Sequence, residues 1–279
     1  MLAKVRLYCA LLKCSIRSEL NRVVGRSLHL WRLCPVIFAS AFRKVQKSIA
    51  QRGIFGTAAR CGLLPLMCCR TLVRFWTPSR RRYRQTEIDF DRRYYVDTVR
   101  DLDAGWIAGI ESENWQHGTG YDPAPIRSVT DTLSSLDIRH QDFTFVDFGS
   151  GKGRTLFLAA QFPFAAIVGI EFSPRLHAIA ERNLATYRNP EQSCTNLRAI
   201  FGDAARFPIP EGPAVFFFHH PFDATVFRQV IDNIVASYDQ SRRQLIVVYY
   251  DPKCIDLFPT SLFHECAKGR ERRDGIRSP

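Results

Sequence analysis

The chain has 279 residues, of which 46% are hydrophobic and 24% charged, and this composition excludes an intrinsically disordered protein. Its net charge of +12 is unevenly distributed. The first 85 residues hold 18 Lys and Arg against a single acid, Glu19, whereas the remainder holds 21 bases and 26 acids. The sequence therefore consists of a basic N-terminal extension and a slightly acidic body, and the overall charge does not describe a uniformly basic protein.

Cysteine usage bears on metal binding and on the cellular compartment. Six of the nine cysteines fall within the first 85 residues, no CxxC pair occurs, and the only close His–Cys spacing is His264 and Cys266. A structural zinc site normally requires four suitably spaced ligands, so no metal site is expected. An odd number of scattered cysteines fits a reducing compartment such as the cytoplasm better than a secreted disulfide framework.

The basic extension, residues 1–85, contains apolar stretches at 28–42 and 61–69. Both are shorter than the roughly 18–20 apolar residues that cross a bilayer, so no transmembrane helix is expected. Three interpretations remain open: peripheral contact with an anionic membrane surface, an organellar targeting sequence, and a segment that has no packed role or precedes the true start. Nucleic-acid contact is less favoured, because few aromatic residues are interleaved with the basic ones. Residues 79–84, SRRRYR, are interpreted as a linker to the body.

The body is interpreted as a cap, residues 86–140, followed by a main domain, residues 141–279. A covering helix is expected at 124–138. In the main domain, apolar runs alternate with helix-length segments, which is typical of a parallel α/β sheet with helices on both faces. Strands are expected at 143–150, 165–172, 197–203, 214–222 and 244–252, and helices at 151–162, 173–188 and 224–240. Residues 261–268 are a candidate sixth strand, but little chain remains for a seventh, so the C-terminal strand hairpin is expected to be incomplete. The sequence does not indicate an oligomeric state.

The stretch FVDFGSGKGR, residues 145–154, places three glycines at alternate positions where the first strand of the main domain meets its helix. Such a junction exposes unpaired amide N–H groups at the positive end of a helix dipole. The dinucleotide fingerprint is not met, because its third glycine position is Arg154, and the phosphate-loop pattern lacks its first glycine. Asp147 precedes the glycines on the strand, where its carboxylate would repel a pyrophosphate but can pair with an ammonium group.

The pattern D-x-G-x-G-x-G, from Asp147 to Gly153, resembles the first motif of the class I S-adenosylmethionine-dependent methyltransferases, which have a Rossmann-like fold. The resemblance implies that Asp147 lies beside the methionine ammonium group, with the loop amides around the amino-acid part. It also implies that Glu171 accepts hydrogen bonds from the ribose hydroxyls, while Asp203 and the amide of Ala204 recognise adenine. The residues expected to bind S-adenosyl-L-methionine are Asp147, Gly149, Ser150, Gly151, Gly153, Glu171, Phe172, Asp203 and Ala204. A tight turn for the loop, a helix cap for Glu171 and a turn for Asp203 remain the structural alternatives.

The stretch HHPFD, residues 219–223, follows the fourth expected strand, where the methyl acceptor binds in this family. Methyltransferases that act on planar amino groups carry [ND]-P-P-[YFW] there, and this chain matches only the second half of that pattern. Methylation of a nucleobase or a glutamine amide is therefore disfavoured. A neutral imidazole of His219 or His220 could instead take a proton from an amine. Either ring could also serve only to shape the pocket, because neighbours on a strand point to opposite faces.

Upstream, the Tyr121-x-Pro123 element before the covering helix is similar to a loop of DOT1-like and related seven-strand protein lysine methyltransferases. Together, FDRRYYVDT (90–98) and FGSGKGR (148–154) are similar to a mostly bacterial methyltransferase set without an assigned substrate. These resemblances imply an amine acceptor, with a protein lysine favoured, and a third candidate catalytic residue in Tyr121, although a turn explains Tyr121 equally well. The alternatives are a nucleic-acid methyltransferase and a non-catalytic S-adenosylmethionine-binding protein.

Overall fold

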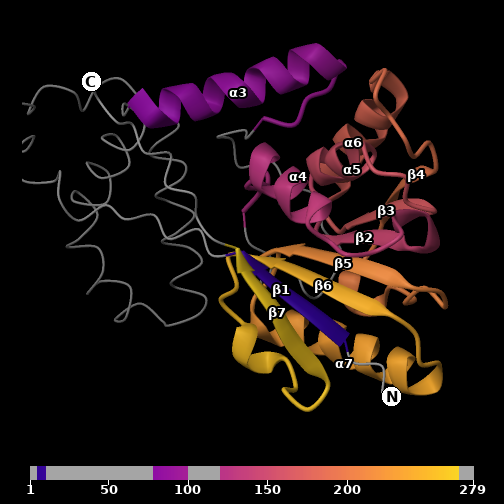
Figure 1. Cartoon of the computed structure of the whole chain (residues 1–279). Helices are drawn as coiled ribbons and strands as arrows, with labels where there is room; N and C mark the ends of the chain where they lie inside the picture. The colour runs from indigo at the N-terminus through magenta and orange to yellow at the C-terminus, as the bar shows by residue number, and fades with distance from the viewer. Residues whose placement is uncertain (1–4, 11–77, 100–119, 270–279) are drawn as a thin grey trace, which may run out of the picture. The chain divides into compact units, whose positions relative to one another are not determined.

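A seven-stranded sheet lies at the centre of the computed structural model, which describes residues 5–10, 78–99 and 120–269 (Figure 1). Its strand order is β4-β3-β2-β5-β6-β1-β7, and every neighbouring pair is parallel. The strands are β1 (Val5–Ala10), β2 (Thr144–Phe148), β3 (Ala166–Glu171), β4 (Leu197–Phe201), β5 (Ala214–His219), β6 (Leu245–Tyr250) and β7 (Phe263–Gly269). The Rossmann-like parallel α/β architecture predicted from the sequence is thereby confirmed, as are the five expected strands of the main domain and the sixth at its C-terminal end.

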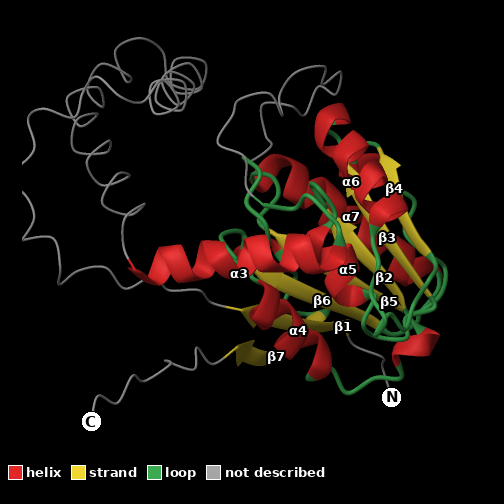
Figure 2. Ribbon diagram, turned by 90° about the horizontal axis from the view of Figure 1, so that it is seen from above, coloured by secondary structure: helices red, strands yellow, loops and turns green. Residues whose placement is uncertain are grey.

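Helices cover both faces of this sheet (Figure 1, Figure 2). On one face lie α4 (Ile126–Ser134), α5 (Arg154–Ala159) and α6 (Pro174–Thr186), and on the other lies α7 (Ala224–Gln240). Helix α6 begins as its sequence predicts, with Pro174 in the first turn and the side chain of Ser173 accepting a hydrogen bond from the amide of Leu176. Short 3₁₀ turns occupy η5 (His140–Asp142), η6 (Ala204–Arg206) and η7 (Ile255–Leu257). The expected covering helix corresponds to α4.

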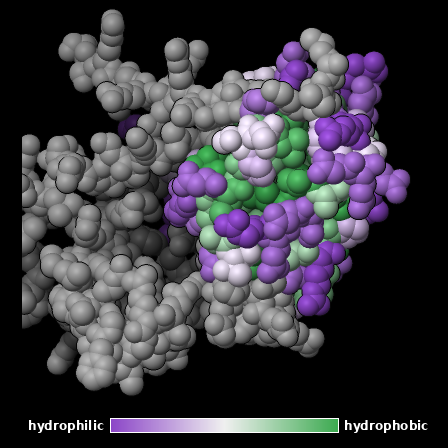
Figure 3. All heavy atoms as spheres, turned by 90° about the horizontal axis from the view of Figure 1, so that it is seen from below, coloured by the Kyte–Doolittle hydropathy of each residue, from purple (hydrophilic) through white to green (hydrophobic). Residues whose placement is uncertain are grey.

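Two apolar cores result from the alternation of side chains along the strands. Phe217 of β5 and Val248 of β6 belong to the core beneath α4 and α5, whereas Phe218 and Tyr249 belong to the core beneath α7. Strands β3 and β6 are buried along their whole length, as expected for a parallel sheet covered on both faces. On the face seen in Figure 3, the described surface has an apolar area at its centre, framed by hydrophilic residues.

Strand β1 was not expected from the sequence, which assigned residues 5–10 to the basic extension. It lies between β6 and β7 and pairs in parallel with both, for example Leu7 with Val247 and with Glu265. Its inward side chains are buried, with Val5 0% and Leu7 4% exposed. Among the described residues only β7 follows β6, so β1 rather than a C-terminal hairpin provides the seventh strand.

The interpretation of residues 79–84 as a linker is wrong, because they lie inside helix α3 (Pro78–Tyr94). The chain divides into two compact units: residues 78–89 fall in one, and the sheet, residues 90–99 and residues 120–269 fall in the other. The apolar stretches at 28–42 and 61–69 lie outside the described residues. Within the described ranges, no helix combines the length and the apolar character needed to cross a membrane.

Candidate functional site

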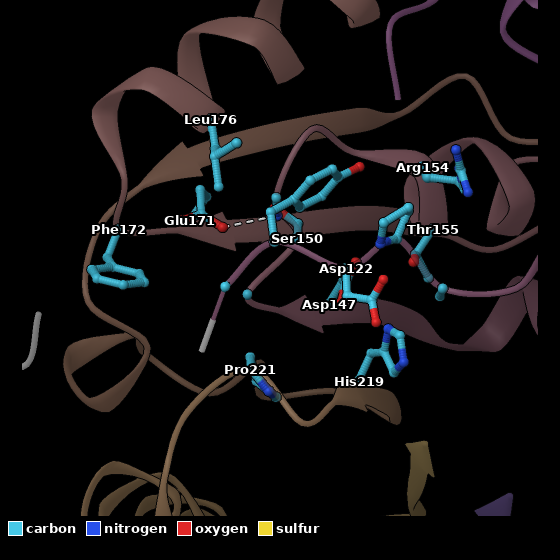
Figure 4. Close-up of a pocket in the computed structure, with 16 residues that line it drawn as sticks. Asp122, Asp147, Ser150, Arg154, Thr155, Glu171, Phe172, Leu176, His219 and Pro221 are labelled. Carbon is cyan, nitrogen blue, oxygen red and sulfur yellow. Dashed lines mark hydrogen bonds between the residues drawn. The ribbon is translucent and has the colours of Figure 1, made fainter. Parts of the chain in front are cut away.

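A cavity opens at the carboxyl ends of three neighbouring strands, β3, β2 and β5, and is bounded by the segment that precedes α4 (Figure 4). Crevices at this edge of an open parallel sheet are the usual ligand sites of such folds. The residues that line the cavity are Gly120, Tyr121, Asp122, Pro123, Ala124, Asp147, Gly149, Ser150, Gly151, Arg154, Thr155, Glu171, Phe172, Leu176, His219 and Pro221. Most of the site residues expected from the sequence are thus brought to one cavity.

The glycine loop between β2 and α5 has a backbone that favours glycine. Gly149 and Gly151 have φ values of +80° and +57°, in the left-handed region. A Cβ on Gly149 would collide with the ring of Pro221, and one on Gly151 would collide with the ring of Tyr121. The loop is therefore in direct contact with two walls of the cavity, and a side chain at either glycine would push these walls away.

Glu171, at the end of β3, holds the glycine loop by its carboxylate. Oε2 accepts a hydrogen bond from the amide of Gly151 at 2.8 Å, and Oε1 accepts one from the amide of Ser173 at 2.8 Å. The helix-cap alternative is thus realised, but each carboxylate oxygen keeps a second lone pair. The ribose contact implied for Glu171 stays a prediction that this geometry permits.

Asp147, near the end of β2, is 3% exposed and faces the same cavity as Glu171. Burial raises the pKa of Asp147 to about 8, with a further increase from the charge of Glu171 and an opposing effect of the hydrogen bond from Thr155. Burial likewise raises the pKa of Glu171 to about 7, against the hydrogen bonds from backbone amides that favour its ionised form. Two carboxyl groups that resist ionisation form a site that a cationic ligand would stabilise.

His219, the last residue of β5, reaches the cavity on the face of the sheet that α4 covers. A ring N–H donates a hydrogen bond to the main-chain carbonyl of Asp122, whereas Nδ1 is buried and has no partner. Burial lowers the pKa of His219 below its ordinary value, although the charge of Asp122 acts in the opposite direction. Figure 4 shows the carboxylate of Asp122 and the ring of His219 turned toward one another. The imidazole is therefore neutral near pH 7 and has one lone pair available.

His220 lies on the opposite face from His219 and does not line the cavity. Its backbone has a positive φ of 44°, and its Nδ1 lies 3.3 Å from the hydroxyl of Tyr249. Asp203, Ala204 and Gly153 also lie outside the cavity lining. The carboxylate of Asp203 accepts a hydrogen bond from the amide of Ala205 and caps the turn η6, as its structural alternative requires. An adenine contact at Asp203 and Ala204 stays a prediction.

Four lining residues were not singled out from the sequence: Arg154, Thr155, Leu176 and Pro221. Thr155 and Leu176 look like ordinary residues of amphipathic helices, and nothing in their spacing marks them. Arg154 served only to reject the dinucleotide fingerprint, yet it is 1% exposed. A buried arginine is rarely expected at a helix start, because sequence patterns place charged side chains on the surface.

The donor set fits S-adenosylmethionine in its chemistry. Three carboxylates, from Asp122, Asp147 and Glu171, line the cavity against one guanidinium, from Arg154. This acid excess suits a ligand that carries an ammonium and a sulfonium charge, and the loop amides suit its carboxylate. The same set does not suit a pyrophosphate, as expected from the sequence.

No protein-family model matches the chain, and no curated protein matches its sequence significantly. Among solved structures, an RNA methyltransferase from Salinibacter ruber in complex with S-adenosyl-L-homocysteine is 23% identical, with a TM-score of 0.34 over 47% of this chain and 79% of that one. The 23S rRNA methyltransferase ErmE is 17% identical (TM-score 0.32; 44% of this chain and 45% of that one). The mitomycin 7-O-methyltransferase MmcR is 20% identical (TM-score 0.34; 44% and 35%). This chain spans less than half the length of ErmE and of MmcR, and similarity at this level identifies no residue of the site.

Proposed function

We propose that this protein is an S-adenosylmethionine-dependent methyltransferase that acts on an amine. The observation that carries the proposal is the convergence of Asp147, Glu171 and the left-handed glycine loop on one cavity at the carboxyl end of a parallel sheet. Two buried carboxyl groups with raised pKa values are costly unless a positive charge compensates them. The D-x-G-x-G-x-G resemblance, which was read from the sequence independently, names a cofactor with such charges.

The residues of the chain divide this task between binding and alignment. Asp147 would pair with the ammonium group, the amides of the glycine loop would bind the carboxylate, and Glu171 would accept from the ribose hydroxyls. When bound, S-adenosylmethionine supplies a methyl group on a positively charged sulfur. The protein then has to exclude water and align an acceptor that has a free lone pair.

His219 is assigned as the base that provides this lone pair. At neutral pH an alkylamine is protonated and cannot attack, so one proton must leave its nitrogen first. The unpartnered Nδ1 of His219 accepts that proton, and the nearby carboxylate of Asp122 stabilises the imidazolium that forms. In the complete reaction the amine gains a methyl group, the cofactor becomes S-adenosylhomocysteine, and one proton passes to solvent.

A protein lysine is the favoured acceptor. The acid-rich cavity attracts an ammonium group, and the Tyr121-x-Pro123 element, which resembles that of the lysine-directed members, lines the same cavity. The altered motif at His219 and His220 speaks against a planar amino group. A slightly acidic body, with 26 acids against 21 bases beyond residue 85, also suits a basic protein better than a nucleic acid.

The test is transfer of tritium from labelled S-adenosylmethionine into a fractionated extract of the source organism by the full-length protein. We expect label in protein, recovered as methyl-lysine after acid hydrolysis, and no such label with Asp147→Asn. Label only in RNA or DNA would reject the lysine acceptor. Absence of label from every fraction, by a protein that binds S-adenosylhomocysteine, would reject turnover and leave a binding protein.

A further inference from the structure

Two cations of the glycine loop are buried outside the ligand chemistry proposed above. Lys152 is 0% and Arg154 is 1% exposed. Lys152 Nζ donates to Asp97 Oδ1 at 3.0 Å and to the carbonyl of Val99 at 3.0 Å. Arg154 Nε donates to Thr98 Oγ1 at 2.8 Å, and its Nη2 donates to the carbonyl of Thr98 at 3.0 Å. Both cations therefore grip one short segment, residues 97–99, which is remote in sequence.

Two further side chains hold the same segment. Asp91, in the last turn of α3, accepts hydrogen bonds from the amides of Thr98 and Val99 at 2.6 and 2.9 Å. Asn183 of α6 bonds the amide and the carbonyl of Asp97, at 2.8 and 2.9 Å, and also the carbonyl of Lys152 at 2.9 Å. The two stretches FDRRYYVDT and FGSGKGR are thus one structural unit, in which residues 97–99 are fixed from three directions.

This unit ends at a wall of the cavity. The carbonyl of Thr98, which Arg154 engages, also accepts a hydrogen bond from the hydroxyl of Tyr121 at 2.7 Å. The ring of Tyr121 lies against Gly151, and Lys152 Nζ lies 5.7 Å from the centre of that ring. Residues 97–99 therefore connect the two buried cations to the side chain that faces the middle glycine of the loop.

A purely structural purpose explains this arrangement poorly. Removing a lysine from water costs several kcal/mol before any partner compensates it, and apolar residues of similar volume would often stabilise a fold equally well. Buried ionic groups are instead well suited to fixing one geometry among several. Here the geometry that they fix is the position of Tyr121 over Gly151.

We propose that Lys152 and Arg154 are positioning residues that hold residues 97–99, and through Thr98 the ring of Tyr121, so that the cavity accepts the amino-acid end of its ligand. The inference rests on the proposed function, which places that end of S-adenosylmethionine along the glycine loop. It adds a selectivity element: the network discriminates ligands with an amino-acid tail from those without one. When the network is broken, Tyr121 must be ordered at the expense of binding free energy.

The test compares two ligands, S-adenosylhomocysteine and 5′-methylthioadenosine, which lacks the amino-acid tail. Lys152→Met and Thr98→Val alter the network without touching the cavity lining. We expect each to weaken S-adenosylhomocysteine about tenfold, the equivalent of one charge-assisted hydrogen bond, while 5′-methylthioadenosine changes by less than about twofold. Equal weakening of both ligands, or of neither, would overturn the proposal.

Tyr121→Phe tests the same connection in a variant that keeps the ring and removes only the hydroxyl. It should reproduce the selective loss, and combining it with Lys152→Met should add little, because both changes break one connection. Additive losses would overturn the proposal. Tyr187→Phe is the matched control, since its hydroxyl also donates to a backbone carbonyl, that of Phe157 at 3.2 Å, but lies outside the cavity. Failure of the unaltered protein to bind S-adenosylhomocysteine would instead remove the proposed function and this inference with it.

Discussion

Asp147 and Glu171 stand near the carboxyl ends of two adjacent parallel strands, β2 and β3, and each is only 3% exposed. The charge of Glu171 adds to burial in raising the pKa of Asp147 to about 8, while burial raises that of Glu171 to about 7. Without a bound cation, both groups are therefore largely protonated at or just below neutral pH. A positively charged ligand reverses this balance, because it favours the ionised forms.

The first prediction concerns protons released on binding. When S-adenosylmethionine binds near pH 7, the pKa values of Asp147 and Glu171 fall, so the complex should release a fraction of a proton up to about one. Calorimetric titration in two buffers of different ionisation enthalpy measures this number. The apparent affinity should rise with pH up to about 8, and a pH-independent affinity without proton release would contradict the raised pKa values.

The second prediction concerns stability without ligand. Asp147 and Glu171 have folded-state pKa values above their ordinary values of 3.8 and 4.5, so each stabilises the fold in its protonated form. That contribution is complete below about pH 4 and is lost as the pH rises to about 8. Asp147→Asn keeps the shape without the charge, so it should melt at a higher temperature than the unaltered protein at pH 8. The difference should shrink toward pH 5, and a difference of opposite sign would count against the assignment.

The third prediction separates the base from the binding site. His219→Gln keeps a polar side chain but removes the basic nitrogen, and it should lower the methylation rate by about 10²–10⁴-fold. Its affinity for S-adenosylhomocysteine should stay within about threefold, because no cofactor contact is assigned to His219. His220→Gln is the companion variant, and its ring lies outside the cavity. An equal loss of rate in both variants would show that His219 has no special role.

The fourth prediction concerns β1. Leu7→Ala should cost about 2–5 kcal/mol of the free energy of unfolding, as for other buried leucines, because Leu7 is 4% exposed within the sheet. Arg6→Ala, on the same strand but only partly buried, should cost far less. Chemical denaturation measures both. If β1 were a dispensable part of the extension, Leu7→Ala would be nearly neutral, and a protein that begins at residue 86 would keep its full stability.

The alternation of apolar runs and amphipathic segments was enough to predict the strands and helices of the main domain. Their burial on both faces leaves a strong pattern in a single sequence. Strand β1 left no such signal, because VRLYCA is short and its only partners, β6 and β7, lie more than 230 residues away in the chain. Helix α3 was read as a linker because its start is crowded with arginines.

The candidate site was predictable where chemistry is written in glycines and acids, and less so elsewhere. Asp147, Glu171 and the loop could be placed because strand ends of a parallel sheet meet at one edge. The separation of His219 from His220 follows from strand alternation, which the sequence could only state as an alternative. The positions of Lys152 and Arg154 depend on tertiary contacts with residues 97–99, and charged side chains at these positions would ordinarily be expected in solvent.

The most direct test of the account is equilibrium binding of S-adenosylhomocysteine to the full-length protein and to Asp147→Asn and Glu171→Gln. We expect saturable one-to-one binding by the unaltered protein and at least about tenfold weaker binding by each variant, since each removes a charge-assisted contact. Asp232→Asn, an exposed acid on α7, should bind as the unaltered protein does. Undiminished binding by both cavity variants, or no binding by the unaltered protein, would contradict the assignment of this cavity to S-adenosylmethionine.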